Sequence, residues 1–194
     1  MMPMFEGASA ATAPFPHAAV PAILARTDAD AALAWLETDA PWQLRVASFY
    51  EQYEFSLTGL NIPSRVRGLT DPAFIEALRD FLRSSVGAVG DLELADICAH
   101  KLVPDQTIRI HNDFIGNEET HRILVQLNSG WAIENGGILM LFSSDRPEDV
   151  FSVVMPTHGS GFAFEISERS FHAVSTIRAG ERYTLVYTFR AGRV

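Results

Sequence analysis

Cysteine and long apolar runs are nearly absent from this sequence of 194 residues. The one cysteine, Cys98, cannot form an intrachain disulfide, so nothing ties the protein to an oxidising compartment. Charged residues or prolines interrupt every apolar stretch, whereas a membrane-spanning helix needs about 20 apolar residues. No Lys or Arg precedes the small-residue run 8–13, unlike in a secretory signal. These absences predict a soluble, cytoplasmic protein without a membrane partner.

Basic residues are also scarce. Fifteen Lys and Arg stand against 24 Asp and Glu, which gives a formal net charge of -9. This balance repels phosphate backbones unless basic residues cluster locally, and no such cluster is evident, so a nucleic-acid partner is not expected. The 47% of hydrophobic residues suffices for a packed core and argues against a disordered chain.

The length and the pattern predict one domain over residues 1–194, because no linker separates two halves. Within it we expect a flexible tail over residues 1–13. A helical support region is expected over 14–90 and a β-rich core over 91–194. Nothing in the sequence indicates an oligomeric state.

Two helices are predicted in the first half. Thr27 or Asp28 is expected to cap the first, and Pro41 to end it. The second begins after Asp71 with a proline at its first position, carries apolar residues at spacings of three and four, and ends near Gly87.

Strands dominate the second half of the sequence. Short alternating or β-rich runs, each bounded by Gly, Asn, Asp or Pro, occur at Thr107–Asp113, Arg122–Asn128, Ile138–Phe142, Val150–Met155, Gly161–Ile166 and Arg182–Phe189. An aromatic run within 48–67 predicts one more strand, followed by a loop. Many short strands at near-regular spacing are typical of a sandwich or jelly roll.

Potential metal ligands occur in two of these runs. Strict alternation over Thr107–Asp113 places Arg109, His111 and Asp113 on one face of a strand. A lone His-x-Asp pair is common, but a second histidine, His172, lies between apolar neighbours before the last strand. Two imidazoles and one carboxylate on one side of a metal leave three positions open, the arrangement suited to non-haem Fe(II) and oxygen chemistry.

An anion site is predicted beside these residues. Arg182 and Thr184 point to the same face of the last strand. A guanidinium grips both oxygens of a carboxylate, and a neighbouring hydroxyl donates beside it. A dicarboxylate keto acid would fit between the metal and Arg182.

The order His111-x-Asp113, His172, Arg182-x-Thr184 resembles that of the Fe(II)- and 2-oxoglutarate-dependent oxygenases, most of all the prolyl 4-hydroxylase-like branch. Residues 127–131, with sequence Leu-Asn-Ser-Gly-Trp, and 136–139, with sequence Gly-Gly-Ile-Leu, are similar to the middle of that family. Residues 14–17, with sequence Pro-Phe-Pro-His, resemble its first strand. The resemblance is detailed over the C-terminal half.

The resemblance implies a mainly β fold, a double-stranded β-helix or distorted, cupin-like jelly roll, supported by two to three N-terminal helices. It implies that His111, Asp113 and His172 bind iron and that Arg182 binds the distal carboxylate of 2-oxoglutarate. O2 is the other cosubstrate, and ascorbate is a candidate stimulant. The implied enzyme is an oxidoreductase, a dioxygenase that hydroxylates an unactivated C–H bond and releases succinate and CO2.

Two positions depart from the family pattern. Where the family often has tyrosines near the cosubstrate, this sequence has Leu102 and Gln126. Gln126 can still donate a hydrogen bond to a carboxylate, whereas Leu102 can form only an apolar wall. We therefore expect Gln126, with Thr184, to complete the cosubstrate site.

The substrate is the least determined feature. Arg109 is a candidate for binding a substrate carboxylate, although a salt bridge to an acidic residue explains it equally well. Tyr50 and Tyr53 could close over the substrate or simply belong to the core. We favour an amino-acid-like small molecule, with a peptide or protein residue as the alternative. A jelly-roll binding protein without turnover is a weaker alternative. His100, His121 and His158 lie in polar or turn contexts and are expected to be solvated.

Overall fold

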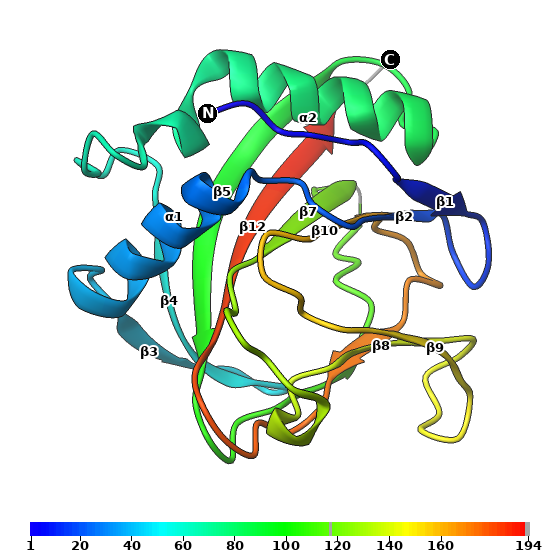
Figure 1. Ribbon diagram of the computed structural model, residues 1–194. Coiled ribbons are helices and arrows are strands. Elements are labelled where there is room, and N and C mark those ends of the chain that lie inside the picture. The colour runs from blue at the N-terminus through cyan, green and yellow to red at the C-terminus, as the bar shows by residue number, and fades with distance from the viewer. Residues whose placement is uncertain (117, 193–194) are drawn as a thin grey trace.

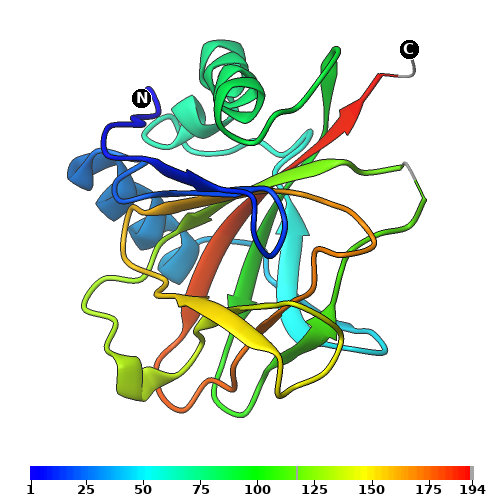
Figure 2. The same ribbon diagram turned by 90° about the vertical axis from the view of Figure 1, so that its right-hand side faces the viewer.

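The computed structural model describes residues 1–116 and 118–192. Within these residues there are two α-helices and twelve strands, and the strands form two antiparallel sheets (Figures 1 and 2). The helices are α1 (Arg26–Thr38) and α2 (Pro72–Ser85). The strands are β1 (Ser9–Ala11), β2 (His17–Val20), β3 (Gln43–Val46), β4 (Glu51–Ser56), β5 (Leu92–Leu102), β6 (Ile108–His111), β7 (His121–Gln126), β8 (Leu139–Phe142), β9 (Val150–Val154), β10 (Gly161–Glu165), β11 (His172–Val174) and β12 (Arg182–Ala191).

The larger sheet has eight strands in the order β1-β2-β10-β7-β12-β5-β4-β3, and the smaller sheet has four in the order β6-β11-β8-β9. Both helices lie on the outer side of the larger sheet, and the smaller sheet lies on its other side (Figures 1 and 2). Many neighbouring strands, such as β10-β7, β7-β12 and β6-β11, are not consecutive in the sequence, as in a jelly roll. The predicted fold class, a double-stranded β-helix with supporting helices, is confirmed.

The second predicted helix, α2, has the expected ends. The Asp71 carboxylate accepts a hydrogen bond from the Ala73 backbone N–H at 2.8 Å, and Pro72 occupies the first position. Gly87 follows the helix with a φ of 83°, a left-handed conformation that ends helices and suits glycine. The apolar side packs into the core through Phe74, Ile75, Leu78, Phe81 and Leu82.

The predicted cap of α1 is wrong. The helix starts at Arg26, so Thr27 and Asp28 lie inside its first turn, and Ala25 precedes it without a capping side chain. The backbone N–H of Ala29 already donates to the Ala25 carbonyl, which places the helix start earlier than the side chains suggest. The helix ends at Thr38, before Pro41.

The first half of the chain is less helical than predicted. Residues 1–13 are not a free tail, because β1 pairs with β2 and Phe5 stacks on Phe81 at 4.3 Å between ring centroids. Strands β2, β3 and β4 lie within the expected helical region 14–90. Of these, β2 pairs with β10 and β4 with β5, so their partners come from the second half. Such long-range pairing is invisible to a local pattern.

The two faces of the larger sheet have separate cores. The outer face packs against α1 and α2, using alternate residues of β12 such as Leu185 and Tyr187. A second apolar cluster, which includes Leu102, Leu141 and Phe164, lies between the two sheets. Because strand residues alternate between faces, the intervening residues of β5, β7 and β12 face this inner space.

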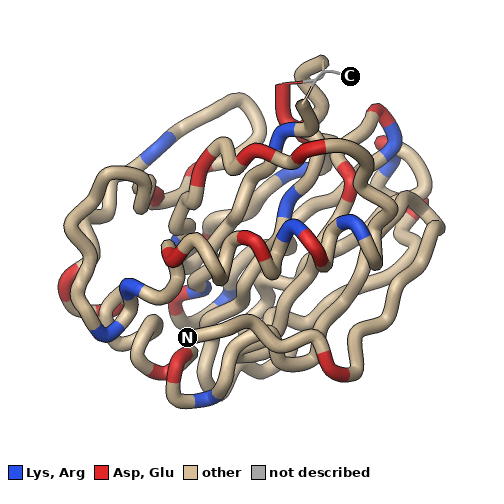
Figure 3. Tube along the Cα trace, turned by 90° about the horizontal axis from the view of Figure 1, so that it is seen from above, with Lys and Arg blue, Asp and Glu red and all other residues tan. Residues whose placement is uncertain are grey.

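Charged residues are dispersed over the helices. Figure 3 shows acidic and basic residues alternating along α2, where Arg79 pairs with Glu76 at 2.7 Å and Arg83 with Asp80 at 2.8 Å. Exposed pairs of this kind contribute little to stability. In the described part of the chain, no helix is both long and apolar enough to cross a membrane.

Candidate active site

A cavity of about 540 Å³ lies between the inner face of the larger sheet and the smaller sheet. The predicted residues His111, Asp113, His172, Arg182 and Thr184 all line it. Residues that are 71 positions apart in the sequence (111 to 182) therefore share one space.

The three predicted metal ligands converge. His111 ends β6 and His172 begins β11, and the two strands place them opposite each other. Asp113 Oδ1 lies 3.3 Å from His111 Nε2, and Asp113 Oδ2 lies 3.2 Å from His172 Nε2. The candidate ligand atoms of the three residues all lie within 4.8 Å of one another. One divalent ion fits such a set of two imidazoles and one carboxylate.

Backbone carbonyls orient both imidazoles. His111 Nδ1 donates to the Arg109 carbonyl at 2.8 Å, and His172 Nδ1 donates to the Ser170 carbonyl at 2.7 Å. A carbonyl can only accept, so the proton sits on Nδ1 and the Nε2 lone pair of each ring is free. Burial and the neighbouring His111 lower the pKa of His172, which keeps that ring neutral.

Asp113 reaches the histidines from beyond the strand. Its φ of 60° turns the chain sharply after β6 and directs the carboxylate back toward the cavity. Arg122 of β7 lies behind it, with Nη1 at 2.7 Å from Asp113 Oδ2, and also pairs with Glu119 at 2.7 Å. Burial alone would raise the pKa of Asp113, but Arg122 and the two histidines hold it well below its usual range.

The predicted cosubstrate residues form a hydrogen-bonded row. Arg182 Nη1 donates to Thr184 Oγ1 at 2.9 Å, and Thr184 Oγ1 donates to Gln126 Oε1 at 3.0 Å. Arg182 is only 4% exposed, and burial lowers its pKa to about 10. Among the described residues, no carboxylate pairs with it and its Nε has no hydrogen-bond partner. A buried cation without a carboxylate partner is costly, so this guanidinium is a candidate to bind an anion.

The backbone around Arg182 makes room for its side chain. Leu102 lies opposite Arg182 on β5 and is 1% exposed, the apolar wall that the sequence predicts. Gly137, with a φ of 66°, faces the arginine stem, and a Cβ there would lie 2.8 Å from Arg182 Cδ. Trp131 Nε1 donates to the Gly136 carbonyl at 2.9 Å and holds this turn. A side chain at position 137 would displace Arg182.

A family model described as the 2OG-Fe(II) oxygenase superfamily matches residues 98–189, a span that contains all of these predicted residues. The chain is a member of this superfamily over residues 98–189. It is therefore an oxidoreductase with 2-oxoglutarate- and Fe(II)-dependent dioxygenase activity, and the superfamily implies iron and 2-oxoglutarate as its metal and cosubstrate. The roles of the individual site residues stay predictions.

Solved structures with the same fold include prolyl hydroxylases and an oxidoreductase of the 2OG-Fe(II) oxygenase family. A Pseudomonas putida prolyl-4-hydroxylase has a TM-score of 0.70 at 17% identity. The match covers 91% of this chain and 93% of the hydroxylase chain. A prolyl hydroxylase from Trichoplax adhaerens was solved in complex with a hypoxia-inducible-factor peptide fragment. It has a TM-score of 0.71 at 12% identity, and the match covers 90% of this chain and 83% of the hydroxylase chain.

A 2OG-Fe(II) oxygenase family oxidoreductase from Burkholderia pseudomallei has a TM-score of 0.63 at 21% identity. It covers 92% of this chain and 88% of its own. No curated protein sequence matches this oxygenase. At these identities the likeness establishes a shared fold.

Arg109 does not face the cavity of the oxygenase. The pairing of β6 with β11 shifts between His111–His172 and Ile108–Val174, so β6 has an additional residue there. Such a bulge breaks the alternation. As a result Ile108 and His111 both line the cavity, and the Arg109 guanidinium donates to the Ser48 carbonyl outside it.

The two candidate tyrosines lie on different faces. Tyr50 lines the cavity beside Phe49, whose ring stacks on His111 with centroids 4.5 Å apart. Tyr53 lies on the opposite face of β4, where the Lys101 ammonium sits 5.0 Å from its ring centroid. Tyr50 therefore remains a candidate for substrate contact, whereas Tyr53 contributes to packing.

Sequence reasoning missed the cavity wall formed by β4 and β5. His100 was expected to be solvated, but it lines the cavity, and burial together with Arg122 lowers its pKa to about 3. Asp96 and Cys98 project from the same face of β5. The period-two spacing of these three residues is the signal that could have identified the strand.

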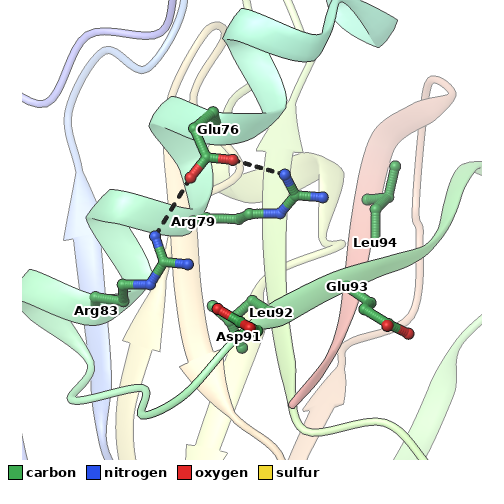
Figure 4. Close-up of a pocket in the computed structure, with 7 residues that line it drawn as sticks. All are labelled: Glu76, Arg79, Arg83, Asp91, Leu92, Glu93 and Leu94. Atoms are coloured by element: carbon green, nitrogen blue, oxygen red, sulfur yellow. Dashed lines mark hydrogen bonds and ion pairs between the residues drawn. The ribbon is translucent and has the colours of Figure 1, made fainter. Parts of the chain in front are cut away.

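A second depression, of about 530 Å³, lies between α2 and the start of β5 (Figure 4). Its two guanidinium groups already have an ion-pair partner, because Glu76 binds Arg79 at 2.7 Å and Arg83 at 3.4 Å. Both guanidinium groups point toward the Glu76 carboxylate in Figure 4. We assign no chemistry to this depression.

Proposed function

We propose that this oxygenase hydroxylates an unactivated C–H bond of a residue in a peptide, using one domain over residues 1–194. In this proposal His111, Asp113 and His172 hold Fe(II), and Arg182, supported by Thr184 and Gln126, binds the distal carboxylate of 2-oxoglutarate. The observation that carries the proposal is the buried, unpaired Arg182 guanidinium in the same cavity as the two-histidine, one-carboxylate cluster.

The residues present fit both groups. The Nε2 atoms of His111 and His172 face the Asp113 carboxylate, so nitrogen and oxygen donors suited to Fe(II) meet at one point. When bound, iron and 2-oxoglutarate would activate O2, the oxidant for C–H hydroxylation, with succinate and CO2 as co-products. The carboxylate of the cosubstrate would give Arg182 the partner that it lacks.

The chain itself contributes orientation and shielding. The carbonyls of Arg109 and Ser170 hold the two imidazole rings in position through their Nδ1 protons. Thr184 and Gln126 fix the guanidinium plane of Arg182 before a ligand arrives, which reduces the entropy lost on binding. Phe49 covers one face of His111 and limits the access of water to that ligand.

We propose a peptide substrate instead of the free amino acid that the sequence alone favours. That preference depends on Arg109 as an inward carboxylate anchor, and Arg109 points away from the cavity. The structural neighbours named above are prolyl hydroxylases, one of them solved with a peptide fragment. The cavity also opens beside Ile115, which is 73% exposed, so an extended chain could enter there.

Anaerobic titration of the apo-protein with Fe(II) and then 2-oxoglutarate tests the metal and cosubstrate sites. We expect a weak visible charge-transfer band that requires both additions. Succinate release on exposure to O2, measured with a panel of blocked peptides and the matching free amino acids, tests the substrate. Absence of the band would refute the assigned site, and turnover with free amino acids alone would refute the peptide assignment.

A further inference from the structure

One wall of the cavity is rich in hydrogen-bond acceptors. Gln52 and Glu54 of β4 and Asp96, Cys98 and His100 of β5 all face it. Glu54 lies directly opposite His100 in the pairing of the two strands. Burial is the largest cause that raises the pKa of the Cys98 thiol. The carboxylates of Glu54 and Asp96 raise it further, so both lie near this cysteine. None of these five residues has a role in the proposed metal or cosubstrate sites.

The two arginine side chains that line the cavity, Arg122 and Arg182, have other roles. Arg122 pairs with Asp113 and with Glu119, each at 2.7 Å. Arg182 is assigned to the cosubstrate carboxylate. Neither guanidinium forms an ion pair with the β4–β5 wall among the described residues.

Among the described residues, Glu54 and Asp96 therefore form no ion pair with a buried cation. The nearest guanidinium to Glu54 belongs to Arg45, at 3.6 Å, and its side chain is 69% exposed, so solvent screens this pair. The Asp96 carboxylate accepts hydrogen bonds from the hydroxyls of Ser56 and Thr58, which are neutral. Two negative charges thus face the cavity with little compensation.

Gln52 provides an independent indication of a ligand. This residue is 2% exposed, and its Nε2 donates to Glu54 at 2.8 Å. The carboxylate can only accept, so the amide orientation is determined and Oε1 must face away from Glu54. In the part of the chain that the structure describes, no donor reaches this buried oxygen. A buried acceptor without a donor is costly, and a ligand with N–H groups would satisfy it.

We propose that the β4–β5 wall binds a guanidinium or ammonium group of the substrate, so that the oxygenase acts on a peptide at or beside a basic residue. The inference rests on the proposed function and specifies its substrate class. The net charge of the cavity agrees with a cationic substrate. Among the described residues that line the cavity there are four carboxylates, those of Glu54, Asp96, Asp113 and Glu119, and two guanidinium groups. Bound Fe(II) and the 2-oxoglutarate dianion cancel, which leaves two negative charges for the substrate to balance.

A second metal ion is a different occupant for the same wall. The potential ligand atoms of Glu54, Cys98 and His100 lie within 4.8 Å of one another. Burial and Glu54 raise the pKa of the Cys98 thiol to about 12, and Sγ donates to the Phe55 carbonyl at 3.4 Å. A protonated thiol is a poor metal ligand, so the observations favour an organic cation.

Two matched pairs of acetylated, amidated tripeptides test the proposal. Ala-Arg-Ala is compared with Ala-citrulline-Ala, and Ala-Lys-Ala with Ala-norleucine-Ala, by calorimetry on the anaerobic protein loaded with Fe(II) and 2-oxoglutarate. We expect each basic peptide to bind about tenfold more tightly than its neutral partner, the effect of one hydrogen-bonded charge. Equal affinities within both pairs, or binding of none of the four peptides, would overturn the proposal.

Isosteric variants locate the effect. Glu54→Gln and Asp96→Asn should each reduce the preference for the basic peptides, and the double variant should abolish it. Asp80→Asn is the matched control, because this α2 side chain is 70% exposed and outside the cavity, and it should leave the preference unchanged. A preference that survives the double variant would overturn the assignment to this wall.

The remaining outcomes separate the two proposals. If the charge-transfer band forms but the peptides show no preference, the cation site fails and the metal site stands. If no band forms, the metal assignment fails, and the same peptide pairs on the metal-free protein still test the wall. A second equivalent of Co(II) with a thiolate charge-transfer band that is lost in Cys98→Ser would assign the wall to a metal and overturn the proposal.

Discussion

On β12, side chains that face opposite ways are equally buried but differ in chemical character. Tyr183, Leu185, Tyr187 and Phe189 face the helices and are at most 3% exposed. Their neighbours toward the cavity, Arg182, Thr184, Val186 and Thr188, are at most 5% exposed. The outer face excludes water with apolar groups, whereas the inner face buries a cation and two hydroxyls.

This difference separates stability from function within one strand. Burial of apolar groups on the outer face stabilises the fold, because the helices cover them completely. Burial of Arg182 on the inner face costs free energy until an anion binds. Substitutions on the outer face should therefore lower stability, whereas substitutions on the inner face should weaken ligand binding.

The largest effect is expected at the inner site. Asp113→Ala or His111→Ala should abolish Fe(II) binding and succinate release, because each removes one of the three proposed ligands. The fold should persist, since Arg122 keeps its ion pair with Glu119 when Asp113 is lost. Iron content, the charge-transfer band and far-ultraviolet circular dichroism measure these outcomes. Unfolding of both variants would instead indicate a structural role.

Arg182→Gln should mainly weaken 2-oxoglutarate binding, by roughly 2–5 kcal/mol for a buried guanidinium–carboxylate pair. Thermal stability should change little or rise, because the variant removes an unpaired buried charge. Calorimetric titration with 2-oxoglutarate measures the affinity. Arg178→Gln, an exposed arginine nearby, is the control and should bind normally. Unchanged affinity in Arg182→Gln would exclude this residue from the cosubstrate site.

The outer face should respond in the opposite way. Leu185 is fully buried against the helices, so Leu185→Ala should lower the free energy of unfolding by about 2–5 kcal/mol. Val186→Ala, next in sequence but on the cavity face, should cost less because its side chain already borders open space. Urea unfolding measures both. Once folded, Leu185→Ala should still bind iron, and loss of binding would mean that the two faces are coupled.

The sequence predicts the inner site better than the strands that carry it. Candidate ligands of fixed type and order, such as His111-x-Asp113 and the later His172, are recognisable without coordinates, and the structure brings them together. Arg109 was misplaced because a bulge depends on the partner strand β11, and a single strand's pattern does not show it. The β5 wall was missed because its inner residues are polar and its pairing with β4 and β12 is long-range.

The smallest effect concerns the outer face in acid. His121 starts β7 opposite Phe189 and is 7% exposed, and burial lowers its pKa to about 4. Between about pH 6.5 and pH 4 the unfolded chain binds a proton that the folded protein excludes, so stability falls as the pH falls. At pH 5 the loss from this residue is on the order of 2 kcal/mol.

His121→Gln removes that proton and should flatten the decline in the free energy of unfolding between pH 6.5 and pH 4. Thr120→Val is the matched control, because it removes the hydroxyl 2.9 Å from His121 Nδ1 but leaves the titrating ring. Urea unfolding at several pH values compares the two with the wild type. Since His121 lies away from the cavity face of β7, iron binding at neutral pH should be the same in all three proteins. An equally steep decline in His121→Gln would assign the acid sensitivity to the cavity histidines, and the inner face would then limit stability as well as function.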